Sequence, residues 1–232
     1  MSDHTETPNL VRLSRFGFVN AYLVREDDGL TLVDTMLSGS AGGILAAAQR
    51  AGAPIVRIVL THAHGDHAGS LDALAERLPG VEIALSAREA RLMAGDRALE
   101  ADEPQSKLRG GWPKVATRPT RVLGDGDRVG SLRVVAAPGH TPGHIALLDE
   151  RDRTLIAGDA FSTLGGISTT GRVNPRFPLV GMSTWDRATA NRTAAMLRGL
   201  DPAVLAVGHG RALRDPAPAI DRALAAVGAG GR

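Results

Sequence analysis

The chain has 232 residues, of which 43% are hydrophobic and 22% are charged, a composition that is ordinary for a soluble globular enzyme. Its 27 basic and 25 acidic residues give a formal net charge of +2, and no run of basic side chains predicts a nucleic-acid surface. There are no cysteines, which excludes disulfides and thiolate ligands, so any metal must be bound by imidazole, carboxylate or water. The length predicts a single domain, 1–232, with its core at about 9–212.

Residues 1–8 contain neither a basic region nor an apolar run, so we predict no secretory signal. No stretch of the sequence approaches the length of a membrane span. We therefore expect a cytoplasmic protein whose partner is a small-molecule substrate, with neither a membrane nor a nucleic acid as a partner. His4 lies in this polar segment and is expected to be solvated.

The first half of the chain alternates short apolar runs with turn residues and with stretches of helical period. Strands are predicted at 9–14, 18–25, 30–34, 55–60 and 81–85. Helices are predicted at 41–51, which ends at Gly52, then from His67 to Leu78, and after Ser86, whose hydroxyl would cap the helix.

The second half predicts strands near 121–123 and 132–137, a hairpin of 144–149 and 154–158, and a strand at 203–207. Helices are predicted at 185–198, capped by Ser183 or Thr184, and from about Pro218. Two long segments, 95–119 and 161–182, fit no regular element, and such loops are usually functional or disordered. This order of strands and helices predicts two packed sheets with helices outside.

The segment His62-Ala63-His64-Gly65-Asp66-His67 places four candidate metal ligands in six residues, directly after an apolar strand. On an extended loop, alternate side chains point the same way, so His62 and His64 share one direction while Asp66 and His67 face a second point nearby. The spacing is typical of a site for two metal ions. The alternative is a polar loop whose histidines cap helices or satisfy buried backbone groups.

Three more candidate ligands lie in glycine-containing turns beside apolar runs: Gly139-His140, Gly158-Asp159 and Gly208-His209-Gly210. A glycine next to a ligand lets the backbone come close to an ion and adopt unusual dihedral angles. Together with the first segment, these residues supply enough ligands for two ions.

This ordered set, which also includes Pro138-Gly139-His140-Thr141-Pro142-Gly143-His144, resembles the metallo-β-lactamase superfamily from about residue 19 to residue 209. The resemblance implies an α+β fold, a four-layer αβ/βα sandwich of two mixed sheets with helices on the outer faces and metals in a cleft between the sheet edges. It also implies that His62, His64 and His140 bind one ion, that Asp66, His67 and His209 bind the other, and that Asp159 bridges them.

Two divalent ions side by side can share a water, lower its pKa and hold the resulting hydroxide against an acyl carbon or phosphorus. Asp66 would be the catalytic residue, because it would ligate one ion and orient this bridging hydroxide. A histidine and aspartate ligand set suits Zn²⁺ best and also accepts Fe or Mn.

Comparison with the branches of the superfamily narrows the expected reaction. Antibiotic hydrolysis is disfavoured for two reasons. The β-lactamases with a thiolate ligand need a cysteine, and the antibiotic-hydrolysing classes in general lack the bridging aspartate. Glyoxalase II carries a C-terminal helical region, whereas 23 residues follow His209 here. Lactonases use a tyrosine beyond the bridging aspartate, but the one tyrosine in this sequence is Tyr22. The predicted function is hydrolysis of an ester, lactone or thioester of a small molecule.

Two alternative functions and the oligomeric state stay open at this point. One is a mononuclear-iron oxidoreductase that resembles the persulfide dioxygenases, and another is a hydrolase of the phosphodiesterase and nuclease branch, although no basic surface for nucleic acid is visible. Many members of the superfamily are dimers, so a homodimer is also an open alternative.

Several further residues have a functional and a structural interpretation. His144 could be a further ligand, but a supporting hydrogen bond is favoured, and Asp34 could either support the metal loop or cap a turn. Trp112 could contact substrate or anchor its loop, and Trp185 is expected in the core. The remaining pair, Arg172 and Arg176, could meet an anionic group of the substrate or be solvated.

Overall fold

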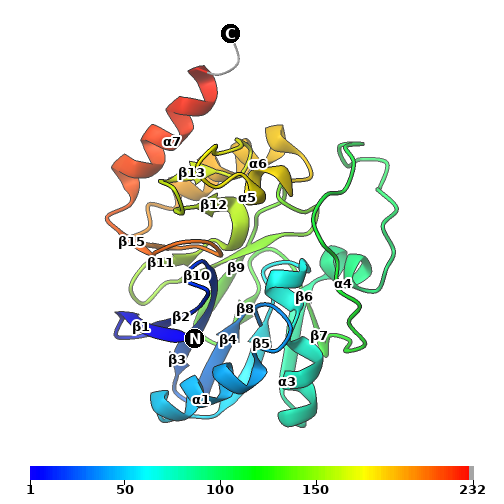
Figure 1. Ribbon diagram of the computed structural model, residues 1–232, viewed down its shortest axis with the longest axis vertical. Coiled ribbons are helices and arrows are strands. Elements are labelled where there is room, and N and C mark those ends of the chain that lie inside the picture. Colours follow the sequence, from blue (N-terminus) through cyan, green and yellow to red (C-terminus); the bar gives the residue numbers. More distant parts are fainter. Residues whose placement is uncertain (230–232) are drawn as a thin grey trace.

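Two β-sheets lie in the middle of the computed structural model, which describes residues 1–229, and helices cover their outer faces (Figure 1). In the view of Figure 1, α1 (Ala41–Ala51) and α3 (Leu71–Arg77) lie at the bottom, and α6 (Arg187–Gly199) and α7 (Ala217–Ala229) lie at the top. The predicted α+β sandwich with helices on its outer faces is therefore confirmed.

The first sheet has seven strands in chain order. Its members are β1 (Ser2–Thr7), β2 (Leu10–Arg15), β3 (Val19–Glu26), β4 (Gly29–Val33), β5 (Ile55–Val59), β6 (Glu82–Ser86) and β7 (Arg121–Leu123). The pairs from β1 to β4 are antiparallel, and those from β4 to β7 are parallel. Because β4 and β5 are parallel, their carboxyl ends meet at one edge of the sheet, which brings Asp34 beside the loop that starts at His62.

Strand β1 was not predicted, since the first strand expected from the sequence was 9–14. Its residues pair with β2 in antiparallel register, with Ser2 opposite Ser14 and His4 opposite Arg12. Most of its side chains are exposed, so no apolar alternation marks the strand in the sequence. His4 is exposed, as predicted.

The second sheet has six strands in the order β15-β14-β11-β10-β9-β8. These are β8 (Arg128–Val129), β9 (Leu132–Ala136), β10 (Ile145–Asp149), β11 (Thr154–Ile156), β14 (Val204–Ala206) and β15 (Leu213–Arg214). Strand β10 is antiparallel to both β9 and β11, and β11 is parallel to β14. The strands β9, β11 and β14 therefore run the same way, and their carboxyl ends meet at one edge.

The structure also corrects several predicted elements. Strands β8 and β15 were not predicted, because two residues are too short to show a period. The helix predicted from His67 to Leu78 is two helices, α2 (Gly65–Ala68) and α3, with Gly69 and Ser70 between them. Ser86 caps α4 (Ala87–Met93) as predicted, but α6 is capped by Asp186 rather than by Ser183 or Thr184.

The two long segments differ from each other. Residues 95–119 contain no helix or strand, as predicted. In contrast, 161–182 contains the two-stranded sheet of β12 (Phe161–Ser162) and β13 (Ser168–Thr169) and the short helix α5 (Leu179–Met182), none of which was predicted. The 3₁₀ turn η1 (Gly158–Ala160) precedes them.

Three clusters of buried apolar side chains pack the layers against one another. One joins the first sheet to α1 and α3, a second lies between the two sheets, and a third joins the second sheet to α6 and α7. The middle cluster includes Val33 and Val59 from the first sheet and Ile156 and Ala206 from the second. Because burying one large apolar side chain contributes roughly 1.5–3 kcal/mol, this packing fixes the strand ends that carry the candidate ligands. No helix within residues 1–229 is long and apolar enough to cross a membrane.

Candidate metal centre

The seven predicted ligands come together where the strand ends of the two sheets meet. His62 and His64 follow β5, and Asp66 and His67 lie in α2. The other three follow β9, β11 and β14, whose carboxyl ends share one edge, and these are His140, Asp159 and His209. All seven side chains are buried except that of Asp66, which is half-buried.

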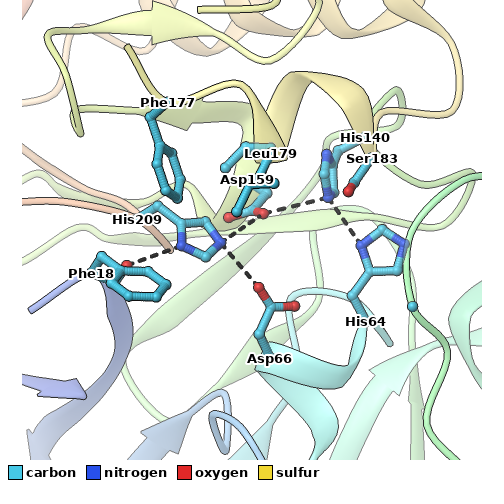
Figure 2. A pocket seen from close by; sticks show the side chains of 11 residues that line it. Phe18, His64, Asp66, His140, Asp159, Phe177, Leu179, Ser183 and His209 are labelled. Atoms are coloured by element: carbon cyan, nitrogen blue, oxygen red, sulfur yellow. Dashed lines mark hydrogen bonds and ion pairs between the residues drawn. The ribbon is translucent and has the colours of Figure 1, made fainter. Parts of the chain in front are cut away.

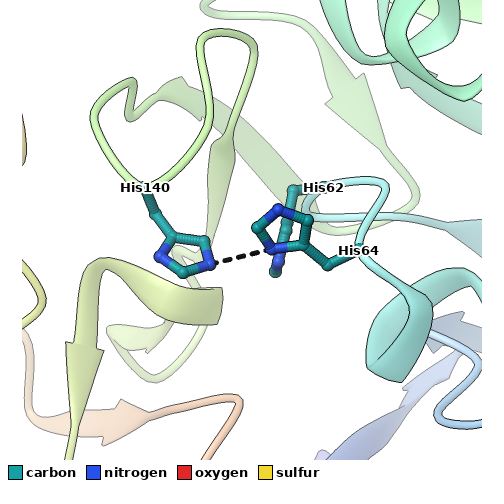
Figure 3. A group of neighbouring side chains, drawn as sticks. All are labelled: His62, His64 and His140. Carbon is teal, nitrogen blue, oxygen red and sulfur yellow. Dashed lines mark hydrogen bonds between the residues drawn. The ribbon is translucent and has the colours of Figure 1, made fainter. Parts of the chain in front are cut away.

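Three overlapping groups of these residues have ligand atoms within 4.8 Å of one another. The first group is His62, His64 and His140, in which His64 Nδ1 lies 3.1 Å from His140 Nε2 (Figure 3). The second group is Asp66, His67 and His209, and the third is His62, His67 and Asp159.

Asp159 lies between the first and second groups. Its Oδ2 is 3.4 Å from His140 Nε2 and 3.3 Å from His209 Nε2 (Figure 2). Its Oδ1 is 3.5 Å from His67 Nε2. His209 Nε2 is also 3.2 Å from Asp66 Oδ2. One carboxylate thus faces both groups, which is the position that the resemblance implies for a bridging residue.

The chemistry of these atoms fits a pair of cations. Among residues 1–229, three buried atoms of this cluster have no hydrogen-bond partner, and they are His62 Nε2, His67 Nε2 and Asp159 Oδ1. Buried polar atoms are nearly always paired, so three buried atoms of one cluster that lack a hydrogen-bond partner indicate a candidate site for a bound cation. Imidazole nitrogen and carboxylate oxygen are the donors that Zn²⁺ and similar divalent ions prefer.

The far side of each imidazole is held by an oxygen acceptor. His209 Nδ1 contacts the Phe18 carbonyl at 3.0 Å, and His64 Nε2 contacts the Arg109 carbonyl at 2.9 Å. A carbonyl oxygen can only accept, so these nitrogens carry the proton and the opposite nitrogens, which face the cluster, are free to bind a metal. His140 Nδ1 contacts Thr184 Oγ1 at 3.1 Å in the same manner.

Asp34 supports the cluster rather than merely capping a turn. Its Oδ2 lies 2.8 Å from His67 Nδ1, and its Oδ1 accepts a 2.8 Å hydrogen bond from the backbone N–H of Thr61. Thr61 Oγ1 also donates to Asp34 and lies 3.1 Å from His62 Nδ1. This carboxylate therefore fixes the orientation of His67 directly and that of His62 through Thr61.

Charge and burial divide the histidines into two classes. Burial lowers the pKa of His62 and of His140 well below the usual range, so both are neutral and able to bind a metal. Burial also opposes the charged form of His209, but Asp159 and Asp66 outweigh it and raise the pKa of His209 to about 9. The pKa of Asp159 is raised by burial and lowered more strongly by His209 and His67, so it lies well below its usual range.

Glycines allow the close approach that the cluster needs at two positions. A Cβ at Gly208 would clash with Asp159 Oδ1 and lie 2.7 Å from the His67 ring. Gly110, with a φ of 91°, has the His64 ring where its Cβ would be. Both positions exclude any other residue unless the cluster shifts.

A pocket opens onto the cluster and is lined by residues from both halves of the chain (Figure 2). Its polar part contains His64, Asp66, His140, Asp159 and His209. The rest of its wall consists of residues that the sequence did not predict, which are Phe18, Gly111, Phe177, Leu179, Val180 and Ser183.

The three residues predicted to contact the substrate do not line this pocket. Arg172 and Arg176 are exposed and line a separate hollow with residues 165–168, so the structure does not bring them to the pocket. Trp112 is half-buried, and its ring lies 4.7 Å from the His64 ring and under the Arg97 guanidinium. Trp112 therefore packs against the candidate ligand His64 and also anchors the 95–119 loop.

Two other predictions from the sequence agree with the contacts. His144 is absent from the three candidate groups, and its Nε2 accepts a 3.0 Å hydrogen bond from the backbone N–H of Asp159, which is a supporting contact. Trp185 is buried, and its Nε1 donates to the Ser106 carbonyl at 2.9 Å. Trp185 thus belongs to the core and also fixes the 95–119 loop.

The fold and this histidine and aspartate cluster define a metallo-hydrolase type of architecture. Residues 14–209 match the family model described as "Metallo-beta-lactamase superfamily", and the chain belongs to this superfamily of metal-dependent hydrolases.

Three similar proteins illustrate its place in the superfamily. YobT, an uncharacterized protein of Bacillus subtilis (strain 168), is 45% identical over 207 residues, which cover 89% of each chain. A hydroxyacylglutathione hydrolase of Stenotrophomonas maltophilia (strain R551-3) is 31% identical over 160 residues, covering 67% of this chain and 51% of that protein. The crystal structure of TTHA1623 in a di-iron-bound form has a TM-score of 0.66 at 27% identity and covers 90% of this chain and 96% of that one.

Proposed function

We propose that the chain is a hydrolase that uses two divalent metal ions to cleave an ester, lactone or thioester bond of a small molecule. The observation that carries this proposal is the position of Asp159 between two ligand groups, together with the three unpaired buried atoms that face one another. Further support comes from TTHA1623, which has been solved with two irons, and from the name of the hydroxyacylglutathione hydrolase.

The ligand assignment follows the geometry. His62, His64 and His140 would hold one ion, and Asp66, His67 and His209 would hold the other, with Asp159 facing both. When bound, such a pair would lower the pKa of a shared water toward neutrality and polarise the oxygen of the scissile bond. Zn²⁺ is the ion that we expect first, with Fe or Mn as alternatives.

The chain's own residues would prepare the reaction. Asp66 lies at the pocket edge, half-buried, and its pKa is lowered by the His209 hydrogen bond although burial opposes this, so it is ionised at neutral pH. An ionised carboxylate there can accept a proton and orient a water for attack. Asp159, ionised and anchored by three imidazoles, would keep the two ligand groups at a fixed spacing.

The test combines metal analysis with activity. We expect elemental mass spectrometry of protein purified without added metal to find about two divalent ions per chain, and hydrolysis of an aryl ester, a lactone or a thioester to be lost on chelation and restored by Zn²⁺. Hydrolysis that persists after complete metal removal would contradict the proposal. One iron per chain with oxygen consumption on a persulfide would assign the chain to the dioxygenase alternative.

A further inference from the structure

Three of the four phenylalanines form a row that runs from the protein surface to the candidate metal centre. The ring centroids of Phe16 and Phe18 are 6.4 Å apart, those of Phe18 and Phe177 are 5.9 Å apart, and those of Phe177 and His209 are 5.8 Å apart. Figure 2 shows Phe18 and Phe177 on either side of His209. We call these three residues the phenylalanine row.

Protein stability does not explain Phe16, the outermost member. Its side chain is 68% exposed, so it gains little from burial. Its φ of 56° is followed by 76° at Gly17, a tight turn in which the first position favours Asn or Gly. A bulky residue in this left-handed conformation is destabilising, and such local conflicts concentrate at functional sites.

Phe16 is nevertheless held in place. The Arg15 guanidinium lies 4.9 Å from the centre of its ring. Arg15 Nη1 in turn donates to the Ser38 carbonyl at 2.8 Å and to Ser40 Oγ at 2.7 Å. The ring therefore rests on a cation that the next loop fixes, so the row is formed before any substrate arrives.

Helix α5 adds further apolar side chains at and near the pocket wall. Leu179 lines the pocket and is 58% exposed, and Met182, from the same helix α5, is 56% exposed. Within residues 1–229, no lysine or arginine lines the pocket, and the predicted Arg172 and Arg176 lie in another hollow. The mouth thus offers apolar surface and no cation for an anionic group, which is typical of a binding site for a hydrocarbon chain.

We propose that the phenylalanine row binds an alkyl or aryl chain attached to the scissile bond, so that the enzyme prefers substrates with a long apolar group over short or anionic ones. This inference depends on the proposed hydrolase function. Substrate contacts would begin at Phe177 and Phe18 beside the metal centre, and longer chains would reach Phe16.

The first experiment measures kcat/KM for p-nitrophenyl esters from acetate to octanoate, and in parallel for alkyl acetates of increasing length. We expect kcat/KM to rise up to about fourfold per added methylene until the row is filled. A rise among the p-nitrophenyl esters would place the chain on the acyl side of the scissile bond, and a rise among the alkyl acetates would place it on the alcohol side. Equal values for acetate and octanoate, with no rise among the alkyl acetates, would overturn the inference while leaving the hydrolase function intact.

The second experiment uses the Phe16→Asn variant, because Asn suits the left-handed turn and the protein should fold with an unchanged or higher Tm. We expect the octanoate-to-acetate ratio of kcat/KM to fall at least about fivefold. Met196→Gln is the matched control, since Met196 is an exposed apolar residue of α6, 42% accessible, and should leave the ratio unchanged.

A readout that needs no catalysis separates the two proposals. Octanoate should raise the Tm of the wild type more than acetate does, and this difference should shrink in Phe16→Asn. If no ester is hydrolysed in a metal-dependent manner but the Tm difference appears, the function fails and the apolar site stands. An unchanged ester ratio in Phe16→Asn, with dissociation of a dimer, would assign the row to a protein interface and overturn the inference.

Discussion

The backbone N–H of Ala63 donates a 2.8 Å hydrogen bond to Glu89 Oε2. The other oxygen of this fully buried carboxylate, Oε1, accepts from Thr141 Oγ1 at 2.6 Å and from the Gly143 N–H at 3.0 Å. Ala63 lies between His62 and His64, and Thr141 follows His140, so one side chain from α4 joins both loops that supply the first ligand group.

This geometry predicts the effect of Glu89→Gln. A glutamine can accept at only one end, so its NH₂ group must face either the Ala63 N–H or the donors of the second loop, and a buried donor is left unpaired at a cost of about 1–3 kcal/mol. We expect the affinity of the first ligand group for Zn²⁺ to fall about tenfold, measured by competition with a chromophoric chelator.

Glu26→Gln is the control for that experiment. Glu26 is also a nearly buried carboxylate, and its oxygens accept from the backbone N–H of Ser131 and from Thr31 Oγ1, neither of which is a candidate ligand. Its loss should lower the free energy of unfolding without changing metal affinity. If Glu89→Gln and Glu26→Gln bind Zn²⁺ equally well, Glu89 has no role in positioning the ligands.

A second prediction concerns Gly208→Ala. The added methyl group would clash with Asp159 Oδ1 and the His67 ring, so Asp159 must move away from the position between the two groups. We expect the variant to bind fewer than two ions per chain and to lose most of its hydrolytic activity. Metal content by elemental mass spectrometry and kcat/KM on one ester are the measurements.

Gly199→Ala provides the comparison, because a Cβ at Gly199, near the end of α6, meets no atom within 4 Å. It should retain both metals and full activity, with a free energy of unfolding unchanged or higher by roughly 0.5–1 kcal/mol. Two ions per chain in Gly208→Ala would show that the close approach of Gly208 is not needed.

A third prediction tests the role of Asp66. Its half-buried position lets alanine replace it without a large cavity, so Asp66→Ala should fold and still bind an ion at the first group. We expect kcat to fall about 100-fold or more, because both a ligand and the carboxylate that orients the water are lost. Asp28→Ala, which removes an exposed ion pair with Arg57, should have no effect on kcat. Equal kcat values for the two variants would refute the role given to Asp66.

The candidate ligands could be named from the sequence, whereas the walls of the pocket could not. His62 to His67 are adjacent in the chain, and the other ligands stand beside glycines at strand ends, so residue type and local pattern suffice. Phe18 and Phe177 are in contact although they are far apart in sequence, and no periodicity links them. Positive charge made Arg172 and Arg176 attractive candidates, but the fold of 161–182, with its small sheet and α5, turns them into another hollow.

Strand β1 could not be predicted from the sequence pattern either. Its side chains are mostly exposed on both faces, so the strand exists because its backbone pairs with β2, and backbone pairing leaves no apolar signature. Conversely, strands β2 to β6 could be predicted because they are rich in apolar residues and mostly buried, and the end of α1 because Gly52 adopts the left-handed conformation. The four-layer arrangement followed from the resemblance to the superfamily.

The last prediction concerns the metal-free protein and pH. The pKa of His209 is lowered by burial but raised further by Asp159 and Asp66, to about 9 against an ordinary value of 6.5. The folded state thus holds this proton more tightly than the unfolded state. The contribution of this proton to the free energy of unfolding is fully present below pH 6.5 and is lost as the pH rises through about 9.

We therefore expect the free energy of unfolding of chelator-treated protein, from urea titrations, to fall as the pH rises from 6.5 to 9. The fall should be smaller in His209→Gln and unchanged in His4→Gln, whose histidine is exposed in β1. With saturating Zn²⁺ the fall should diminish, because a metal binds neutral imidazole and takes over the place of the proton. An equal fall in the wild type and His209→Gln would show that the proton on His209 does not stabilise the metal-free fold.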